Sequence, residues 1–346
     1  MTNGPTTVGP VRVGVIGVGR IGRMHAELLH RHVPGATVGI VYDLHAPFAA
    51  GVAGALGVPM ATSVEEVLSS DVDAVAICSS ADTHVELMVA AAEAGKAVFC
   101  EKPVSLYLDE LDRGLDAIES HGVPFQIGFN RRFDPAHASV AEAVATGRIG
   151  EPHLVRISSR DPEPPSLEYV RTSGGLFLDM TIHDFDMARF VTGSEVVEVF
   201  ARGGVRVAPA FAQAGDIDTA LVTLVHASGC LTAIDNCRAT AYGFDQRVEA
   251  FGSDGMAVSE NPPAHTGVLT TAGGAQRPPL VGGPGFFLER YLPSYERAWT
   301  AFVGALQTGT PPPVGVQDAR APLVIGIAAG QSLREGRAVR LDEVAA

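Results

Sequence analysis

The chain is poor in cysteine and in aromatic residues. It has four cysteines among 346 residues, and aromatic residues make up 6% of it. The cysteines form no C-x-x-C pair, which argues against a structural zinc site and against a disulfide framework. Because two of them lie in apolar runs typical of buried strands, we expect free thiols, a cytoplasmic protein and no bound metal. The four are Cys78, Cys100, Cys230 and Cys237.

Positive charge is also scarce. The chain has 25 Lys and Arg against 39 Asp and Glu, a formal net charge of −14 at pH 7. Nucleic acid binding needs clustered basic residues, and no basic stripe is present, so nucleic acid is not an expected partner. No uninterrupted apolar run approaches the ~18 residues of a membrane-spanning helix, and the first ten residues lack the pattern of a signal peptide. We therefore expect no membrane association.

The first 130 residues alternate short apolar runs with segments of helical periodicity. The runs are rich in β-branched residues, and we expect strands at 11–16, 37–42, 73–78, 97–100 and 124–129. Helices are expected between them, at 20–32, 82–95 and 105–120. This alternation predicts a parallel sheet, and runs that are apolar throughout are typical of strands covered on both faces.

The pattern changes after residue 130. Longer strands with alternating apolar residues are expected at 151–160, 195–206, 218–226, 230–238 and 246–252. No helical segment separates the last three, which favours an antiparallel sheet with one covered face. Residues 261–286 are rich in Pro and Gly and are expected to form a loop, with helices following at about 289–308 and 317–335. We therefore expect two domains, 1–130 and 131–346.

A glycine motif follows the first expected strand. Gly17-x-Gly19-x-x-Gly22 opens a helix at Arg20, and the next strand ends in Asp43, about 25 residues after the first glycine. With this context the motif predicts a dinucleotide-binding Rossmann fold rather than a plain turn. Gly17 allows the tight turn, Gly19 lets the backbone approach the pyrophosphate, and Gly22 lets helix and strand pack closely.

The residue after the second strand indicates which dinucleotide binds. The pyrophosphate would lie at the helix N-terminus, where the dipole favours an anion. Asp43 would accept hydrogen bonds from the ribose hydroxyls and repel a 2′-phosphate, and the following Leu44-His45 offers no arginine to bind one. The sequence therefore favours NAD over NADP.

Three segments follow strands of the expected parallel sheet, at 77–84, 100–103 and 128–135. Ligands of such sheets bind at the carboxyl ends of the strands. Glu101-Lys102-Pro103 is the most informative, because Pro103 stiffens the turn and Lys102 would point a cation into the crevice. The alternative for Lys102 is a solvated lysine in a loop.

A second candidate group lies in the later part of the chain. Asp179 and His183 are four residues apart, so they share a face if they lie on one helix. A carboxylate beside an imidazole orients it and raises its basicity, which suits a general base. The spacing also fits a metal pair, but no third ligand is evident. A further alternative is a helix N-terminal acid with a core histidine.

Together these motifs resemble the Gfo/Idh/MocA oxidoreductases over nearly the whole chain. The resemblance rests on the glycine motif, on Glu101-Lys102-Pro103 and on the helix with Asp179 and His183. The segments 126–135, 158–190 and 241–252 resemble family members that act on inositols. The resemblance implies an α/β protein with an N-terminal Rossmann doubly wound parallel sheet. It also implies a C-terminal α+β domain with an open, mostly antiparallel sheet whose outer face forms a homo-oligomer, often a tetramer.

The same resemblance implies a reaction: NAD-dependent oxidation of one ring hydroxyl of a cyclitol, with myo-inositol favoured. His183 would act as general base, Lys102 would stabilise the developing alkoxide, and Asp179 would hold the imidazole or a neighbouring hydroxyl. Alternatives are scyllo-inositol or another polyol or pyranose as substrate, or a non-catalytic NAD-binding regulator. The implied cofactor contacts are Gly17, Gly19, Arg20, Ile21, Gly22, Asp43, Ser79, Ser80, His84, Glu101 and Lys102. The implied substrate contacts are Asn130, Arg131, Asp161 and Tyr242.

Overall fold

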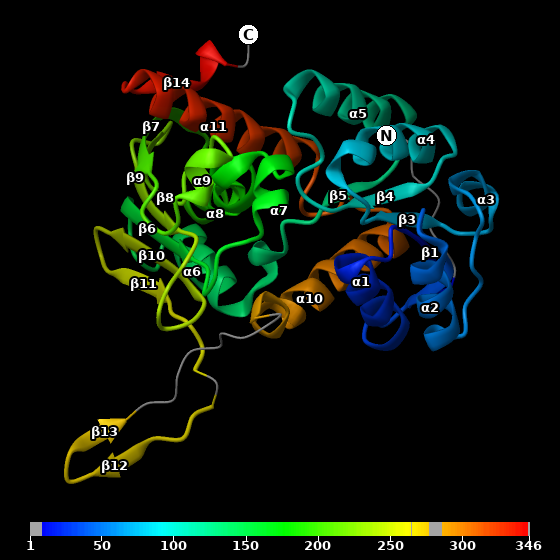
Figure 1. The fold of residues 1–346 in the computed structure, drawn as a ribbon, viewed down its shortest axis with the longest axis horizontal. Coiled ribbons are helices and arrows are strands. Elements are labelled where there is room, and N and C mark those ends of the chain that lie inside the picture. The colour runs from blue at the N-terminus through cyan, green and yellow to red at the C-terminus, as the bar shows by residue number, and fades with distance from the viewer. Residues whose placement is uncertain (1–8, 264, 277–285, 345–346) are drawn as a thin grey trace. The chain divides into compact units, whose positions relative to one another are not determined.

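The computed structural model describes residues 9–263, 265–276 and 286–344, which form two compact units (Figure 1). The first unit holds the residues up to Asn130 together with Pro293–Ala321, and the second holds Arg131–Leu292 and the residues from Pro322 on. The domain division expected from the sequence assigned everything after residue 130 to the second domain. The segment 293–321 instead packs within the first unit, for reasons given below.

The first unit is built on a five-stranded sheet in the order β2-β1-β3-β4-β5. Every neighbouring pair is parallel, which confirms the parallel sheet expected from the alternating pattern. The strands are short and buried on both faces, as their uninterrupted apolar character indicated. They are β1 (Val11–Ile16), β2 (Ala36–Tyr42), β3 (Ala74–Ile77), β4 (Ala97–Cys100) and β5 (Phe125–Ile127).

Helices lie on both faces of this sheet. The expected helices are present as α1 (Arg20–Arg31), α4 (His84–Glu93) and α5 (Leu108–His121). Two further helices were not predicted, α2 (Ala46–Leu56) and α3 (Val64–Ser69). The α2 segment is dominated by Ala, Gly and Val and has little helical periodicity. The short α3 did carry a signal, because Ser63 caps it by accepting the N–H of Glu66 at 3.2 Å.

Two long helices, α10 (Phe286–Thr308) and α11 (Val316–Glu335), each pass from one unit to the other. Each crosses at an internal proline, Pro293 in α10 and Pro322 in α11. The part of α10 in the first unit contributes Trp299 to the apolar cluster that also contains Phe99 of β4. The two rings stack with centroids 4.1 Å apart, and Trp299 is fully buried. This packing explains why the segment belongs to the first unit.

The second unit contains a seven-stranded sheet in the order β11-β10-β6-β9-β8-β7-β14. Its neighbours are antiparallel except for β6 and β9, so the expected open, mostly antiparallel sheet is confirmed. The strands are β6 (Pro152–Arg160), β7 (Val196–Gly204), β8 (Thr219–His226), β9 (Leu231–Cys237), β10 (Asp245–Gly252), β11 (Met256–Ser259) and β14 (Val339–Arg340).

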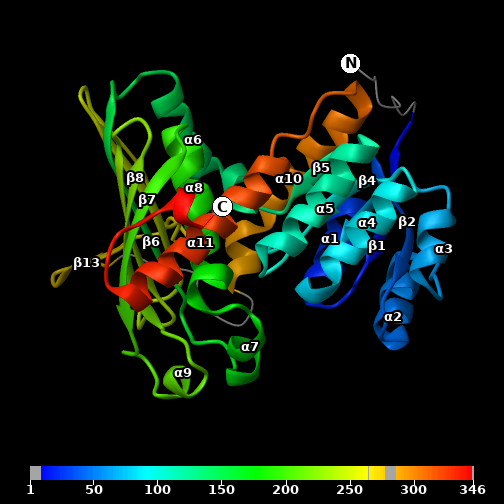
Figure 2. The same ribbon diagram turned by 90° about the horizontal axis from the view of Figure 1, so that it is seen from above.

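Helices cover one face of this sheet. The helices α6 (Pro135–Ala145), α8 (Ile182–Thr192) and α11 lie along the same side of the strands in Figure 2, and their apolar residues share one core with them. The other face carries every second residue of the strands, many of them exposed. Two short helices, α7 (Leu167–Thr172) and α9 (Ala210–Gln213), and a π-helical turn, η3 (Phe177–Thr181), complete the unit.

The segment 261–286 was expected to be a loop. Its described part instead contains a small hairpin of β12 (Leu269–Thr271) and β13 (Gly274–Gln276), while residues 264 and 277–285 lie outside the described residues. None of the described helices is both long and apolar enough to cross a membrane.

Candidate functional site

The glycine loop has the geometry that the motif predicted. Gly17 has a φ of +84°, and a Cβ there would lie 2.5 Å from the backbone nitrogen of Ser79. A Cβ on Gly22 would lie 1.8 Å from the carbonyl oxygen of Gly17, so the helix can approach the strand only without a side chain. A Cβ on Gly19 would meet nothing within 4 Å. The backbone of this loop therefore borders space of the kind a pyrophosphate needs.

The start of α1 has the features of an anion site. Gly19 occupies the N-cap position, no side chain caps the helix, and its first turn holds no acidic residue. Helix N-termini present backbone N–H groups and a positive dipole end to a bound phosphate. These residues therefore fit the pyrophosphate of a dinucleotide.

Asp43 is tied to the glycine loop. Its Oδ2 accepts the N–H of Val18 at 2.7 Å, and its Oδ1 accepts the N–H of His45 at 2.8 Å. The carboxylate is therefore held beside the loop, and each oxygen keeps a lone pair for a ribose hydroxyl. The neighbouring Leu44 is 93% exposed and offers no positive charge for a 2′-phosphate.

A buried histidine, His84, contacts the loop after β3 and holds it in place. His84 Nδ1 lies 2.9 Å from the carbonyl oxygen of Pro103, and Nε2 lies 3.0 Å from that of Ser79. His84 thereby links the loops that follow β3 and β4. Its ring is 2% exposed, so the structure places it behind these loops as a support. Ser80 is exposed, and Ser79 pairs its hydroxyl with that of Thr83 at 2.6 Å.

The Glu101-Lys102-Pro103 segment leaves the end of β4 with a cis peptide bond between Lys102 and Pro103. Glu101 is buried, and its Oε1 lies 2.8 Å from Nε2 of His25 in α1. The other ring nitrogen of His25 accepts the indole N–H of Trp299 at 2.8 Å. His25 therefore supports the acid that precedes Lys102, a role that the sequence did not reveal because His25 lies within the buried face of a helix.

Asp179 and His183 lie on one continuous helical stretch, but this stretch is not a uniform α-helix. Asp179 belongs to the π-helical turn η3, and His183 is the second residue of α8. The two residues were expected to share a face if they lie on one helix, and the regular α-helical spacing behind that expectation does not hold across the π-helical turn. A π-helical turn places more than four residues in one turn, so it changes the direction of the side chains relative to one another, and such turns are frequent at functional sites.

Both carboxylate oxygens of Asp179 accept hydrogen bonds. Oδ1 accepts the phenol O–H of Tyr169 in α7, and Oδ2 accepts Nη1–H of Arg238, each at 2.8 Å. The same Nη1 lies 3.9 Å from Oδ2 of Asp161. Burial raises the pKa of Asp161 to about 6, although Arg238 acts in the opposite direction. Neither Arg238 nor Tyr169 was predicted from the sequence.

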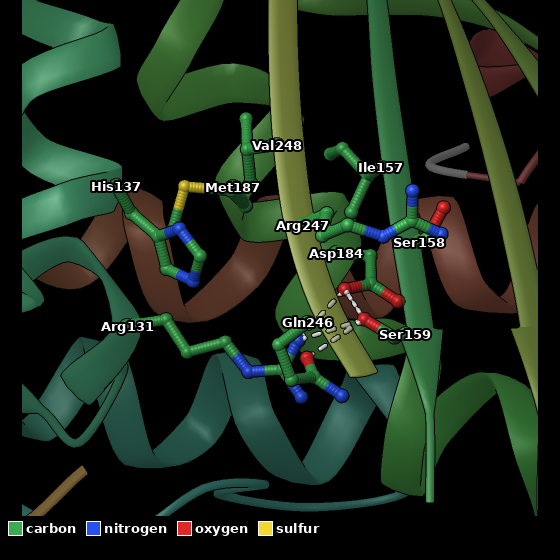
Figure 3. Close-up of a pocket in the computed structure, with 10 residues that line it drawn as sticks. All are labelled: Arg131, His137, Ile157, Ser158, Ser159, Asp184, Met187, Gln246, Arg247 and Val248. Atoms are coloured by element: carbon green, nitrogen blue, oxygen red, sulfur yellow. Dashed lines mark hydrogen bonds and ion pairs between the residues drawn. The ribbon is translucent and has the colours of Figure 1, made fainter. Parts of the chain in front are cut away.

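Asn130 and Arg131, expected near the substrate, have protein partners. Asn130 donates through Nδ2 to the hydroxyl of Ser294 at 3.0 Å. Arg131 donates through Nη1 to Oδ1 of Asp184 at 2.8 Å and to the hydroxyl of Ser159 at 3.0 Å (Figure 3). Asp184 is fully buried next to His183 in α8, and burial raises its pKa. Arg131 thus compensates a buried carboxylate beside the proposed base.

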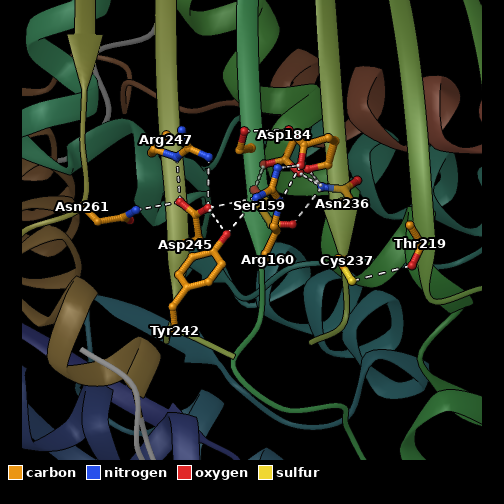
Figure 4. Close-up of polar contacts among 12 residues, drawn as sticks. Ser159, Arg160, Asp184, Thr219, Asn236, Cys237, Tyr242, Asp245, Arg247 and Asn261 are labelled. Atoms are coloured by element: carbon orange, nitrogen blue, oxygen red, sulfur yellow. Dashed lines mark hydrogen bonds and ion pairs between the residues drawn. The ribbon is translucent and has the colours of Figure 1, made fainter. Parts of the chain in front are cut away.

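Tyr242 lies in a different network. Its hydroxyl donates to Oδ2 of Asp245 and accepts from Nη1 of Arg160, each at 2.8 Å (Figure 4). Alternation along β6 places Arg160 on the opposite face of the sheet from the buried Ser159. The structure therefore brings Asp161 and Asp179 together around Arg238, and it groups Tyr242 with the charged residues of the other face.

The remaining predicted residues divide between the units. Arg20 is exposed and Ile21 half-buried at the start of α1. Lys102 is half-buried in the first unit, and Asp179 and His183 belong to the second. Among the described residues no group of three His, Cys, Asp or Glu side chains is placed to hold a metal ion.

Comparison with known proteins gives the same assignment for both units. A profile of the oxidoreductase family with an NAD-binding Rossmann fold matches residues 11–129, and one of the Gfo/Idh/MocA C-terminal domain matches 137–258. The myo-inositol 2-dehydrogenase of Thermotoga maritima is 47% identical over 93% of this chain and 96% of its own length. The NAD(+)-dependent scyllo-inositol 2-dehydrogenase of Bacillus subtilis is 35% identical over 93% of both chains.

A solved structure agrees. The crystal structure of a probable dehydrogenase from Thermotoga maritima matches with a TM-score of 0.93 and 46% identity, covering 96% of this chain and 99% of that one. The glycine loop, the two sheets and the sequence matches all lead to one conclusion: the chain belongs to the Gfo/Idh/MocA family of NAD-binding oxidoreductases.

Proposed function

We propose that this chain oxidises one ring hydroxyl of a cyclitol to a ketone, with myo-inositol converted to 2-keto-myo-inositol (scyllo-inosose) as the favoured reaction. The observation that carries this proposal is the 47% identity to a myo-inositol 2-dehydrogenase over 93% of the chain, through both units. NAD, when bound, supplies the hydride acceptor. The glycine loop and Asp43 would hold it, with further contacts from the loops after β3 and β4.

In this proposal Lys102, Asp179 and His183 carry the chemistry. His183 takes the proton of the reacting hydroxyl, because an imidazole is suited to accept a proton near neutral pH. Lys102 donates a hydrogen bond to the same oxygen as its negative charge develops. Asp179 is restrained by Tyr169 and Arg238, so it offers a fixed acceptor to a hydroxyl or to the imidazole.

Similarity to a scyllo-inositol dehydrogenase supports scyllo-inositol as a second candidate substrate. The relative from Bacillus subtilis is a scyllo-inositol 2-dehydrogenase, and it matches this chain over the same 93%. The two substrates differ in the configuration of one hydroxyl, so the same base and the same lysine serve either.

The experiment that tests the reaction follows NADH absorbance with purified protein, NAD and separate samples of myo-inositol, scyllo-inositol, D-chiro-inositol and glucose. Fastest NADH formation with myo-inositol is the expected result. Preference for scyllo-inositol would replace the favoured substrate and keep the reaction. Binding of NAD without turnover of any cyclitol or sugar would contradict the proposal and support a non-catalytic NAD-binding protein.

We also propose that the chain forms a homo-oligomer, a tetramer being favoured, through the uncovered face of the seven-stranded sheet. The strand register places six exposed apolar side chains on this face, and exposed apolar patches mark association sites. They are Phe200, Leu221, Leu231, Phe251, Met256 and Val258. A cytoplasmic location belongs to the same proposal, because all four cysteines are free thiols. Light scattering on the wild type and on Leu221→Glu tests the interface.

A further inference from the structure

β6 and β9 are the parallel pair of the seven-stranded sheet, and their carboxyl ends meet at one edge. Asp161 is the first residue after β6, and Arg238 is the first residue after β9. The N–H of Asp161 donates to the carbonyl oxygen of Cys237 at 3.0 Å, which holds the two chain segments side by side beyond the last paired residues. The backbone therefore places an acid and a base together at this edge.

Arg238 is at the centre of the group that gathers there. Its side chain is 3% exposed, and its Nη1 lies 2.8 Å from Oδ2 of Asp179 and 3.9 Å from Oδ2 of Asp161. One guanidinium thus lies within ion-pair distance of two carboxylates that come from different elements. Tyr169 contacts the other oxygen of Asp179, so that carboxylate has a donor on each side.

The guanidinium is not saturated by these contacts. Its Nε and Nη2 are buried and have no hydrogen-bond partner among the described residues. Burying a donor without a partner is costly, so unused donors beside two carboxylates indicate a site made for additional oxygen atoms. An inositol has a hydroxyl on every ring carbon, and each hydroxyl both donates and accepts.

We propose that Arg238 is a positioning and specificity residue of the cyclitol site, which holds Asp161 and Asp179 as a fixed pair of acceptors that reads the hydroxyl pattern of the ring. This inference rests on the proposed function. A lysine would not replace it, because the planar guanidinium offers several donors in fixed directions whereas an ammonium is a compact point charge.

Arg238 also favours the charged form of Asp161. Burial and the charges of Asp179 and Asp184 raise the pKa of Asp161, whereas Arg238 and Arg131 lower it. Removing the guanidinium leaves a more strongly raised pKa, so Asp161 keeps its proton at neutral pH and becomes a donor. A cyclitol hydroxyl that had donated to the carboxylate then loses a charged acceptor.

The test compares Arg238→Gln, Arg238→Lys and Tyr169→Phe with the wild type. The first removes the charge, and the second keeps the charge without the planar guanidinium. The third removes the phenol O–H that donates to Asp179 and changes no charge. Arg113→Gln is the matched control, because Arg113 is an exposed arginine of α5 whose ion-pair partner, Glu86, is also exposed. The measurements are the Kd of NAD, KM and kcat for myo-inositol and scyllo-inositol, kcat/KM from pH 5 to 9, and Tm.

For Arg238→Gln we expect KM for the preferred isomer to rise about 10- to 100-fold, the range of a lost hydrogen bond to a charged group. The isomer ratio of kcat/KM should change, the acid limb of the pH profile should move to higher pH, and the Kd of NAD should stay within about twofold. In Arg238→Lys the acid limb of the pH profile should lie where it does in the wild type, because the positive charge is kept. The ratio of kcat/KM between the two isomers should still differ from that of the wild type. Tyr169→Phe should leave the acid limb in place, and Arg113→Gln should match the wild type.

An unchanged isomer ratio and pH profile in both Arg238 variants would overturn the inference, including when Tm falls, because that result describes a purely structural residue. A wild type that neither turns over nor binds any cyclitol would overturn the proposed function together with this inference. An active wild type with insensitive variants overturns the inference alone, so the two failures are distinguishable.

Discussion

His25 and Glu101 form a buried pair in which the imidazole Nε2 lies 2.8 Å from the carboxylate Oε1. Trp299 fixes the direction of this contact, because an indole N–H only donates and His25 Nδ1 must accept it. The proton of the neutral ring therefore lies on Nε2 and is donated to Glu101. This chain of contacts runs from the single tryptophan of the sequence to the residue before Lys102.

Replacing His25 with Phe should disturb the segment that carries Lys102. The change leaves Oε1 of the buried Glu101 without the imidazole donor, at a cost of about 1–3 kcal/mol or more for a charged group. We expect a lower Tm, a lower kcat and a shifted Trp299 fluorescence maximum. Adding Glu101→Gln to His25→Phe should recover part of the lost stability, and a purely additive double variant would show that the two residues are not coupled.

Substitutions at two glycines of the loop should have different effects, one on NAD affinity and the other on the stability of the fold. Gly19→Ala adds a methyl group that meets no protein atom, so we expect an unchanged Tm and a weaker affinity for NAD. Gly22→Ala places its methyl against the Gly17 carbonyl and should lower the stability of the whole unit. Gly54→Ala in α2 is the control, because its methyl has open space and alanine favours a helix by about 0.8–1.0 kcal/mol. Calorimetric titration with NAD measures the affinity. If Gly19→Ala binds NAD as tightly as the wild type does, the backbone at Gly19 does not approach the pyrophosphate.

Cofactor preference should follow Asp43. The double variant Asp43→Ser with Leu44→Arg removes the carboxylate that repels a 2′-phosphate and adds a cation on an exposed position, so kcat/KM should shift from NAD towards NADP. Because Asp43 also accepts the N–H of Val18, the single variant Asp43→Ser is the control for damage to the loop. Retained NAD preference in the double variant would mean that Asp43 does not contact the ribose.

The chain has two lysines, Lys96 and Lys102, which gives the catalytic assignment an internal control. Lys96 donates to the carbonyl oxygens of Ser70 and Val72 at 3.0 and 2.8 Å, as a structural residue does. We expect Lys102→Met to lower kcat about 10²- to 10³-fold, the range for loss of one donor to a developing oxyanion. NAD affinity should change little, and Lys96→Met should keep kcat. Steady-state kinetics with NAD titrations tests both, and equal losses in the two variants would refute the role of Lys102.

His137 should make the chain less stable in acid. It is 2% exposed and shares a hydrogen bond with Ser259 at 2.8 Å, and burial lowers its pKa to about 3. The unfolded chain takes up a proton at this residue near pH 6.5 and the folded chain does not, so the contribution of His137 to stability is lost as the pH falls below about 6.5.

The comparison with His137→Gln isolates this residue. The difference in free energy of unfolding between the wild type and the variant should shrink by about 2 kcal/mol between pH 7.5 and pH 5, following the linkage slope of 1.36 kcal/mol per pH unit. Urea unfolding at the two pH values measures it, with the exposed His153→Gln as control. A difference that does not depend on pH would show that folding does not lower the pKa of His137.

Much of the fold follows from local patterns in the sequence. All five strands of the parallel sheet were predicted because each is an apolar run followed by a helix or a turn. The place of α10 could not be predicted, since it depends on the contact between Trp299 and Phe99, which lie far apart in the sequence. The helix α2 was missed because its small residues are packed by their surroundings rather than arranged on one face.

The candidate site was predictable where backbone geometry dictates the residue. Gly17 and Gly22 are required by a positive φ and by a close approach, so the motif alone located them. Arg238 and His25 carry no such signal, because their importance comes from carboxylates contributed by other elements. Tyr242 was expected at the substrate. Its hydrogen bonds to Arg160 and Asp245 depend on strand register and on a turn, which spacing in the sequence does not reveal.

The return of α10 to the first unit has a consequence for the order of synthesis. A ribosome has released the strands and most helices of the NAD-binding unit well before it reaches Trp299, whose ring covers Phe99. Until then the nascent unit exposes an apolar surface that only the late segment can cover, so the second unit must be synthesised before the first is complete. A fragment that ends at residue 130 should therefore aggregate, and supplying 293–321 as a separate peptide should reduce that aggregation.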